Sequence, residues 1–279
     1  MPELPEVETI ARGLDKRVRG DLIESVWLGS HPEPLKSSAR EISSVLSGSR
    51  IRTVRRVGKH IVFDLEADNG REGKSNLNKN RQWIVHLGMS GRMLVTAPDE
   101  PVAKHTHAVA SLASGRELRF VDPRRFGRLS VVVAEGGFSG PGTEPLTITV
   151  EEFAKLFRGR KTPIKAALLN QKLLHGVGNI YADESLFRAG LRPRRQAGRL
   201  TAAELQRLHR SVRQVLQEAI KLGGSSVSDY VDSEGREGFF QLQHRVYLRT
   251  GEPCLVCGTP IKRIVIGGRG THYCPKCQR

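Results

Sequence analysis

Four cysteines near the C-terminal end constrain the fold of that part of the chain more than any other feature. They form two Cys-x2-Cys pairs separated by 16 residues: Cys254, Cys257, Cys274 and Cys277. This spacing matches a tetrahedral zinc site, and four protein ligands close the shell, as in structural rather than catalytic sites. Residues 261–266 and 271–273 are β-like, so we expect a two-stranded zinc ribbon that could hardly fold without its metal. The alternatives are disulfides, against which the lack of a signal peptide argues, and redox cysteines, which need only one such pair.

The chain carries a strong excess of positive charge. Its 279 residues include 45 Lys and Arg against 29 Asp and Glu, a formal net charge of +16. An excess of this size indicates a polyanionic partner, most simply nucleic acid, although a merely soluble basic protein would also show it. No apolar run approaches the roughly 18 residues that suggest a membrane span. We therefore expect a soluble intracellular protein that does not bind membranes.

The hydrophobic pattern predicts an α+β chain of several domains. Apolar residues at helical spacing over residues 4–18, with Pro5 in the tolerated first turn, predict a leading helix. Regular short strands after one helix indicate a β-sandwich or flattened barrel. The β-like runs are 22–28, 51–57, 60–66, 82–87, 105–112, 117–121 and 128–134. The polar, Gly- and Asn-rich stretch 67–81 predicts a long hairpin loop.

Gly and Pro cluster at 135–149, which we take as a linker between an N-terminal domain (1–134) and a helical domain (150–224). Helices are predicted in the second of these domains at 151–157, 163–170, 179–189 and 201–222. The last is the clearest, because Thr201 and Glu204 form a capping box. Residues 225–243 are polar and predict a loop, and residues 244–279 form the terminal zinc module.

The start of the chain, Met1-Pro2-Glu3, offers a second kind of chemistry. Once Met1 is removed, Pro2 is a free secondary amine. Such an amine attacks an aldehyde-level carbon and gives a cationic iminium that has no N–H to lose, an electron sink of the kind used in covalent catalysis. Glu3 stands beside it as a carboxylate that could move protons. Many proteins carry Pro at position 2 only because Met is trimmed, so Pro2 alone does not establish catalysis.

Several turns carry residues suited to DNA. The turn 122–127 (DPRRFG) places two guanidinium groups and an aromatic ring together, which could fill the gap left by an unstacked base. Met89, in the turn GMSG, is either a core residue or a second wedge. A Gly-rich stretch before a predicted helix lets backbone N–H groups and Asn179 face a phosphate. Arg269 lies on a Gly-flanked hairpin tip, and Lys59 follows a glycine at a strand start. Taken singly, each is also compatible with an ordinary surface or core residue.

Together these motifs resemble the formamidopyrimidine-DNA glycosylase family, bacterial base-excision repair enzymes that also include endonuclease VIII. The resemblance covers nearly the whole chain. It rests on PELPEVE at 2–8, GK at 58–59, HLGMSG at 86–91, DPRRFG at 122–127, HGVGNIYADE at 175–184 and GRGTHYCPKCQ at 268–278. It implies a β-sandwich N-terminal domain, a helix-two-turn-helix domain and a C-terminal zinc ribbon. It also implies damaged double-stranded DNA as partner, one structural zinc ion without a redox cofactor, a monomer and a place in the bacterial cytosol.

The resemblance further implies catalytic roles. Pro2 would be the Schiff-base nucleophile on C1′, Glu3 the proton-transfer carboxylate, and Glu6 a support for the site. Lys59 would contact phosphate near the lesion and assist proton transfer in elimination. Arg269 would aid the second elimination.

It implies DNA contacts as well. Asn179 and Arg269 would grip the phosphates around the flipped nucleotide. His105 and Lys165, in less distinctive motifs, would be further DNA contacts. Three residues would fill the void left by the flipped base, with the first Arg of the turn facing the estranged cytosine: Met89, Arg124 and Phe126.

The start of the chain favours the oxidised-purine branch of this family. Endonuclease VIII members typically begin Pro-Glu-Gly-Pro, whereas Leu4 stands here in place of that glycine. Residues 225–243 are long enough for a lesion-capping loop. We therefore expect excision of 8-oxoguanine and formamidopyrimidines, with β,δ-elimination AP lyase activity. The alternatives are an endonuclease VIII-like enzyme for oxidised pyrimidines, a non-catalytic zinc-ribbon DNA-binding protein, and an RNA-binding ribbon protein.

Overall fold

The computed structural model describes residues 1–67, 80–226 and 236–279. The chain divides into two compact units, one of residues 1–139 and 225–238, the other of residues 140–224 and 239–279. The division falls inside the predicted linker 135–149, and the helical part and the zinc module share the second unit. No helix of the described residues is long and apolar enough to cross a membrane.

A helix opens the first unit. α1 (Leu4–Val18) spans the residues predicted for it, and its N-cap is Glu3. The Glu6 carboxylate accepts the N–H of Glu3 at 2.8 Å, one arm of a capping box that satisfies an N-terminal donor of the helix. Val7, Ile10 and Leu14 are fully or almost fully buried. The apolar stripe of α1 therefore packs into the core of the first unit.

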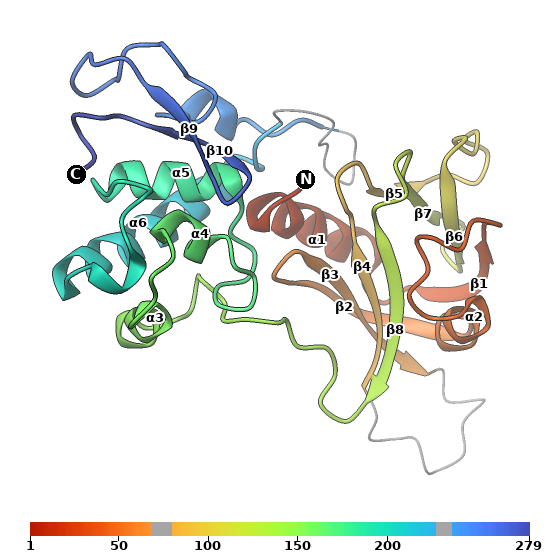
Figure 1. The fold of residues 1–279 in the computed structure, drawn as a ribbon. Helices are drawn as coiled ribbons and strands as arrows, with labels where there is room; N and C mark the ends of the chain where they lie inside the picture. The colour runs from red at the N-terminus through yellow and green to blue at the C-terminus, as the bar shows by residue number, and fades with distance from the viewer. Residues whose placement is uncertain (68–79, 227–235) are drawn as a thin grey trace. The chain divides into compact units, whose positions relative to one another are not determined.

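Eight antiparallel strands form one hydrogen-bonded sheet in the order β5-β7-β6-β1-β2-β3-β4-β8 (Figure 1). Their bounds are β1 Leu22–Leu28, β2 Ser49–Val57, β3 His60–Ala67, β4 Asn80–His86, β5 Arg92–Thr96, β6 Thr106–Leu112, β7 Glu117–Val121 and β8 Arg128–Ala134. Only two residue pairs join β1 to β2, so the sheet divides into two halves. The buried side chains of both halves and of α1 belong to one core, which confirms the predicted sandwich with its leading helix.

Two elements of the first unit were not predicted. β5 is a short strand directly after the turn at 88–91, and α2 (Ala39–Leu46) is a two-turn helix. The signal for α2 was present, because Ser38 and Glu41 form a capping box around its start. β3 and β4 flank the predicted hairpin loop and pair with each other, while residues 68–79 of that loop lie outside the described residues.

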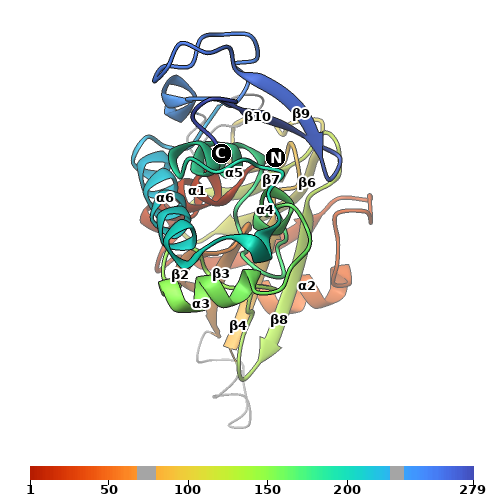
Figure 2. The same cartoon turned by 60° about the vertical axis from the view of Figure 1, so that its left-hand side comes forward.

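The second unit is helical and ends in a β-hairpin. Its elements are α3 Val150–Phe157, α4 Ile164–Leu168, α5 Asn179–Arg188, the 3-10 helix Ala197–Arg199, α6 Ala202–Lys221, the 3-10 helix Phe240–Gln243, and the strands β9 Lys262–Ile266 and β10 Arg269–Tyr273. α5 packs against α6 and against β10 (Figure 2). The predicted capping box of Thr201 and Glu204 is present. Of the predicted loop 225–243, residues 227–235 lie outside the described residues.

Candidate active site and zinc centre

The first residues of the chain are held by a buried carboxylate. Pro2 and Glu3 are both buried, and Glu6 is 2% exposed. One oxygen of Glu6 accepts the N–H of Glu3 at 2.8 Å, and the other accepts the N–H of Ser225 at 2.8 Å. Glu6 therefore fixes the position of the residue next to Pro2 and ties it to the start of the segment at 225. That Glu6 supports a catalytic site stays a prediction, and these two hydrogen bonds are the means by which it would do so.

Lys59 occupies the turn between β2 and β3. Gly58 has φ +61°, a left-handed conformation that a glycine adopts without strain. This turn carries Lys59, which is buried in the same unit as Pro2 and Glu3. The pKa of His86 is lowered to about 4. Burial is the largest cause, and the positive charge of nearby groups, including Lys59, adds to it. His86 belongs to the HLGMSG motif, but sequence reasoning gave it no role.

Asp122 organises the two turns that carry the expected void-filling residues. Its carboxylate is fully buried. One oxygen accepts the Ser90 hydroxyl at 2.6 Å and the N–H of Arg124 at 3.2 Å. The other oxygen accepts the N–H of Gly127 at 2.7 Å. One carboxylate thus links the turn at 88–91 to the turn at 122–127, a role that sequence reasoning missed because the two turns are distant in the chain.

The residues expected to fill the void lie on these linked turns. Met89 is 43% exposed and Phe126 is 47% exposed. The guanidinium of Arg124 lies 4.8 Å from the centre of the Phe126 ring, a cation–π contact. A Cβ at Gly88 would lie 2.5 Å from backbone atoms of the facing turn, so close packing requires glycine there. The carbonyl of His105 accepts the N–H of Asp122 at 2.9 Å, which places His105 beside this group.

The second unit holds Asn179 and Arg269 on neighbouring elements. Arg269 is the exposed first residue of β10. The side-chain amide of Asn179 donates to the carbonyl of Gly270 at 3.0 Å, so Asn179 is bonded to the residue that follows Arg269. Asn179 begins α5, whereas the N-cap is Gly178. The Asn179 side chain therefore does not cap this helix, and its amide bonds to the hairpin.

Lys165 is buried within the second unit. Its side chain is 0% exposed and its Nζ lies 2.7 Å from Asp183, also 0% exposed. The same ammonium donates to the Gly270 carbonyl and to the Thr271 hydroxyl, both at 2.9 Å. The expected contact of Lys165 with DNA stays a prediction, and in this structure its ammonium is bonded to groups of the protein. Lys165 supports the strand that carries Arg269.

Two adjacent acids on α5 anchor the zinc module. Asp183 accepts the backbone N–H of His272 on β10 at 2.8 Å. Glu184 accepts the backbone N–H groups of residues 245–247 at 2.9–3.0 Å. Burial raises the pKa of Glu184, against those hydrogen bonds, which lower it. The sequence analysis gave these two acids no role of their own, because they appeared only within the HGVGNIYADE motif. Their backbone partners in the zinc module lie about 60 to 90 residues away along the chain.

The buried ion pair leads to a first prediction. Lys165→Met leaves the Asp183 carboxylate buried without its cation, and we expect the free energy of unfolding to fall by about 3–5 kcal/mol. Urea denaturation measures this. Lys161→Met, at an exposed lysine in the same segment, is the matched control and changes stability by less than about 0.5 kcal/mol. Equal stability of the two variants would contradict the prediction.

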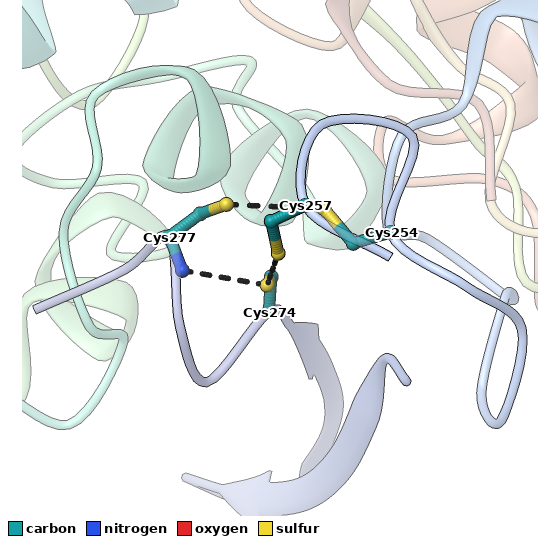
Figure 3. A group of neighbouring side chains, drawn as sticks. All are labelled: Cys254, Cys257, Cys274 and Cys277. Carbon is teal, nitrogen blue, oxygen red and sulfur yellow. Dashed lines mark hydrogen bonds between the residues drawn. The ribbon is translucent and has the colours of Figure 1, made fainter. Parts of the chain in front are cut away.

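The four cysteines converge on one point. Their sulfur atoms all lie within 4.8 Å of one another, with Cys254 and Cys277 at 3.9 Å and Cys257 and Cys274 at 3.5 Å. Figure 3 shows the four side chains directed toward a common centre. Zn–S bonds of about 2.3 Å in a tetrahedron place sulfurs roughly 3.8 Å apart. The donor set therefore fits one structural zinc ion, as predicted.

Comparison with known proteins gives three family matches along the chain. Residues 1–129 match the formamidopyrimidine-DNA glycosylase N-terminal domain, and residues 140–231 match the formamidopyrimidine-DNA glycosylase H2TH domain. Residues 251–279 match the zinc finger found in FPG and IleRS. A formamidopyrimidine-DNA glycosylase of Solibacter usitatus is 43% identical over 284 residues, covering 100% of both chains.

The chain belongs to the formamidopyrimidine-DNA glycosylase family. Solved structures of the family superpose on it closely. A mutant Lactococcus lactis FPG in complex with a Fapy-dG containing DNA has a TM-score of 0.87 and 34% identity, covering 100% of both chains. The wild-type Lactococcus lactis FPG in complex with an oxidised pyrimidine containing DNA has a TM-score of 0.85 and 33% identity, again over 100% of both chains. The resemblance read from the motifs is thereby confirmed.

In this member of the glycosylase family, the expected site residues fall into two groups. The first unit contributes the N-terminal amine position, its carboxylates, the turn lysine and the void-filling turns: Pro2, Glu3, Glu6, Lys59, Met89, His105, Arg124 and Phe126. The second unit contributes the amide and guanidinium expected at phosphates, Asn179 and Arg269, and the four zinc ligands.

Proposed function

We propose that the chain is a base-excision repair DNA glycosylase that removes oxidised purines from duplex DNA and also cuts the strand as an AP lyase. The observation that carries this proposal is the start of α1, where buried Glu6 holds the residue beside Pro2 in a chain of this family. The related Lactococcus lactis protein in complex with Fapy-dG DNA supports oxidised purines as the substrate class.

The chemistry follows from the secondary amine. After removal of Met1, the Pro2 nitrogen attacks C1′ of the damaged nucleotide, the bond from C1′ to the base breaks, and the base leaves with a proton. Opening of the sugar ring gives an iminium between Pro2 and C1′, and Glu3 handles the protons. The iminium acidifies C2′, so loss of a C2′ proton expels the 3′ phosphate, and a second elimination expels the 5′ phosphate. No redox cofactor is needed.

The exposed side chains of the first unit suit the flipped state of the DNA. Extruding a nucleotide costs a few kcal/mol of stacking and pairing. Met89, Arg124 and Phe126, held by Asp122, would occupy the vacated space and offset part of that cost. Asn179 and Arg269 would hold phosphates near the flipped nucleotide. Residues 225–243 would cap the lesion, a role that rests on length and on the tie between Ser225 and Glu6.

Excision rates on three duplexes test the proposal. We expect 8-oxoguanine opposite cytosine to be excised faster than 8-oxoguanine opposite adenine and faster than thymine glycol. Glu3→Gln removes the proton-transfer carboxylate and should lower the excision rate by roughly 100-fold or more. This loss also shows that the measured activity does not come from a contaminating enzyme. No excision by the unaltered protein would refute the glycosylase.

The oxidised-pyrimidine activity is the second candidate. It is favoured by the Lactococcus lactis complex with DNA that contains an oxidised pyrimidine. The same three duplexes decide between the two, because a preference for thymine glycol over 8-oxoguanine would assign this chain to the pyrimidine branch.

A further inference from the structure

A polar pocket lies in the helical part of the second unit, between α6 and the start of α3. The two helices pack against each other (Figure 2). The volume of the pocket is about 420 Å³. None of the residues that line it has a role in the reaction proposed above, and among the described residues that form its walls none is acidic. The pocket is therefore a candidate site for a different ligand.

One wall of the pocket is a polar stripe along α6. Its members recur three or four residues apart, so they share one face of the helix. They are Gln206, Arg210, Arg213, Gln214 and Gln217. All of them are exposed except Arg213, which is half-buried. The apolar stripe of α6 lies on another face and is buried, so the polar stripe is not the surface that α5 covers.

The start of α3 and a histidine of α6 form the other wall. Thr149 and Val150 come from the start of α3. Nε2 of His209 lies 2.9 Å from the carbonyl of Ile148 and donates to it, since a carbonyl only accepts. The His209 ring lies 5.3 Å from that of Phe153, edge to face. His209 thus joins α6 to α3 and holds the two walls of the pocket together.

The two arginines of the stripe carry positive charge that the protein does not balance. Within the part of the chain that the structure describes, neither guanidinium group has a hydrogen bond or an ion pair. The carboxylates of α6, Glu204 and Glu218, are each paired with an arginine outside that helix. On the α3 side, Glu151 does not line the pocket, and Glu152 is bonded to the N-cap of its own helix. Both guanidinium groups are therefore available to an anionic ligand.

The chemistry of the stripe favours a polypeptide that carries carboxylates. An arginine guanidinium binds a carboxylate through two parallel hydrogen bonds. Three of the five side chains in the stripe are glutamine amides, and each amide can both donate and accept. A phosphate diester only accepts, whereas a peptide backbone offers N–H and carbonyl groups. At about 1.5 Å per residue the stripe is about 16 Å long, which is the length of roughly five residues of extended peptide.

We propose that this pocket is a docking site for an extended acidic segment of a partner protein. Its carboxylates would bind Arg210 and Arg213, and its backbone would bind the glutamine amides. DNA is the alternative polyanion. The residues proposed to contact phosphate, Asn179 and Arg269, lie on α5 and β10, and neither element lines the pocket. The pocket is thus built from other elements than those contacts, and its role does not rest on the proposed function.

A capped synthetic pentapeptide, Asp-Ser-Asp-Ser-Asp, is the probe, because alternate residues of an extended chain face the same side. We expect it to shift the NMR signals of His209 and of the glutamine amides in the stripe, and the counterpart Asn-Ser-Asn-Ser-Asn to leave them unchanged. The double variant Arg210→Gln, Arg213→Gln should bind the acidic peptide at least about fivefold more weakly. The matched control Arg158→Gln, Arg199→Gln removes the same charge at exposed arginines outside the pocket and should keep the affinity.

DNA titration distinguishes the two polyanions. On a duplex with an uncleavable abasic analogue, we expect both double variants to keep the slope of log affinity against log salt. A slope less negative by about 0.9 or more in the pocket variant alone would show that the pocket binds DNA and would overturn the proposal. Equal peptide affinity of the two double variants would also overturn it, as would equal binding of the two peptides. Arg210→Gln alone, at an exposed side chain, should show a smaller loss and serves if the double variant folds poorly.

Discussion

Retention of Met1 is expected to abolish the covalent adduct that borohydride traps between this protein and DNA that contains 8-oxoguanine. With Met1 in place, the Pro2 nitrogen is an amide and cannot attack C1′, whereas the trimmed protein has a free secondary amine. Pro2→Gly with Met1 retained should behave in the same way. Denaturing gels of borohydride-treated mixtures measure the adduct, and mass spectrometry verifies the N-terminus. We expect a loss of at least about 100-fold.

Measurement of DNA binding distinguishes loss of the nucleophile from misfolding of the protein. Both Met1-retaining proteins should bind an abasic-analogue duplex within a few fold of the trimmed protein, because the residues proposed to contact phosphate and to fill the void are unchanged. Pro32→Ala, at an exposed proline far along the chain from the N-terminus, is the matched control and keeps the adduct. An undiminished adduct with Met1 retained would rule out Pro2 as the nucleophile and favour the non-catalytic DNA-binding alternative.

Removal of zinc is expected to unfold residues 244–279 and to lower DNA affinity by at least about 100-fold. Structural zinc sites contribute about 10–16 kcal/mol of binding free energy to small modules at neutral pH, and this hairpin has little other core. Because Arg269 lies on the strand that leads into Cys274, it loses its position when the hairpin melts. After chelation, a zinc-release assay verifies loss of the metal, NMR reports the unfolding and DNA titration reports the affinity. Added Zn²⁺ should reverse both effects.

A matched pair of variants within the first Cys-x2-Cys pair makes the zinc experiment more specific. Cys257→Ser removes a ligand and should reproduce the loss. Leu255→Ser changes an exposed residue between the first two ligands, 61% accessible, and should retain both zinc and DNA affinity. Full DNA affinity in the Cys257→Ser protein after zinc loss would show that the ribbon is not needed for binding.

Local signals in the sequence predicted the local structure well. The helix over residues 4–18 followed from apolar spacing, and the capping box at Thr201 predicted the start of α6. The cysteine spacing predicted the zinc centre because each Cys-x2-Cys pair sits on one turn and needs little help from the rest of the fold. α2 carried the same capping signal at Ser38 and should have been predicted from it.

Contacts between distant segments could not be predicted in this way. A lysine at the start of a helix is normally exposed, and nothing near Lys165 in the sequence indicates that it pairs with Asp183 or donates to a strand 105 residues away. Asp122 looks like a turn residue until Ser90, 32 residues earlier, is seen to share its carboxylate. His60, His86 and Arg128 likewise become neighbours only through strand register.

The carbonyl of Gly270 has a consequence for how this enzyme can be altered. It accepts both the amide of Asn179 and the ammonium of Lys165, one residue from Arg269. Substitutions at Asn179 and Lys165 therefore share an acceptor, and their energetic effects should not add when combined. The effect of a substitution at the start of α5 is therefore expected to depend on which residue stands at position 165.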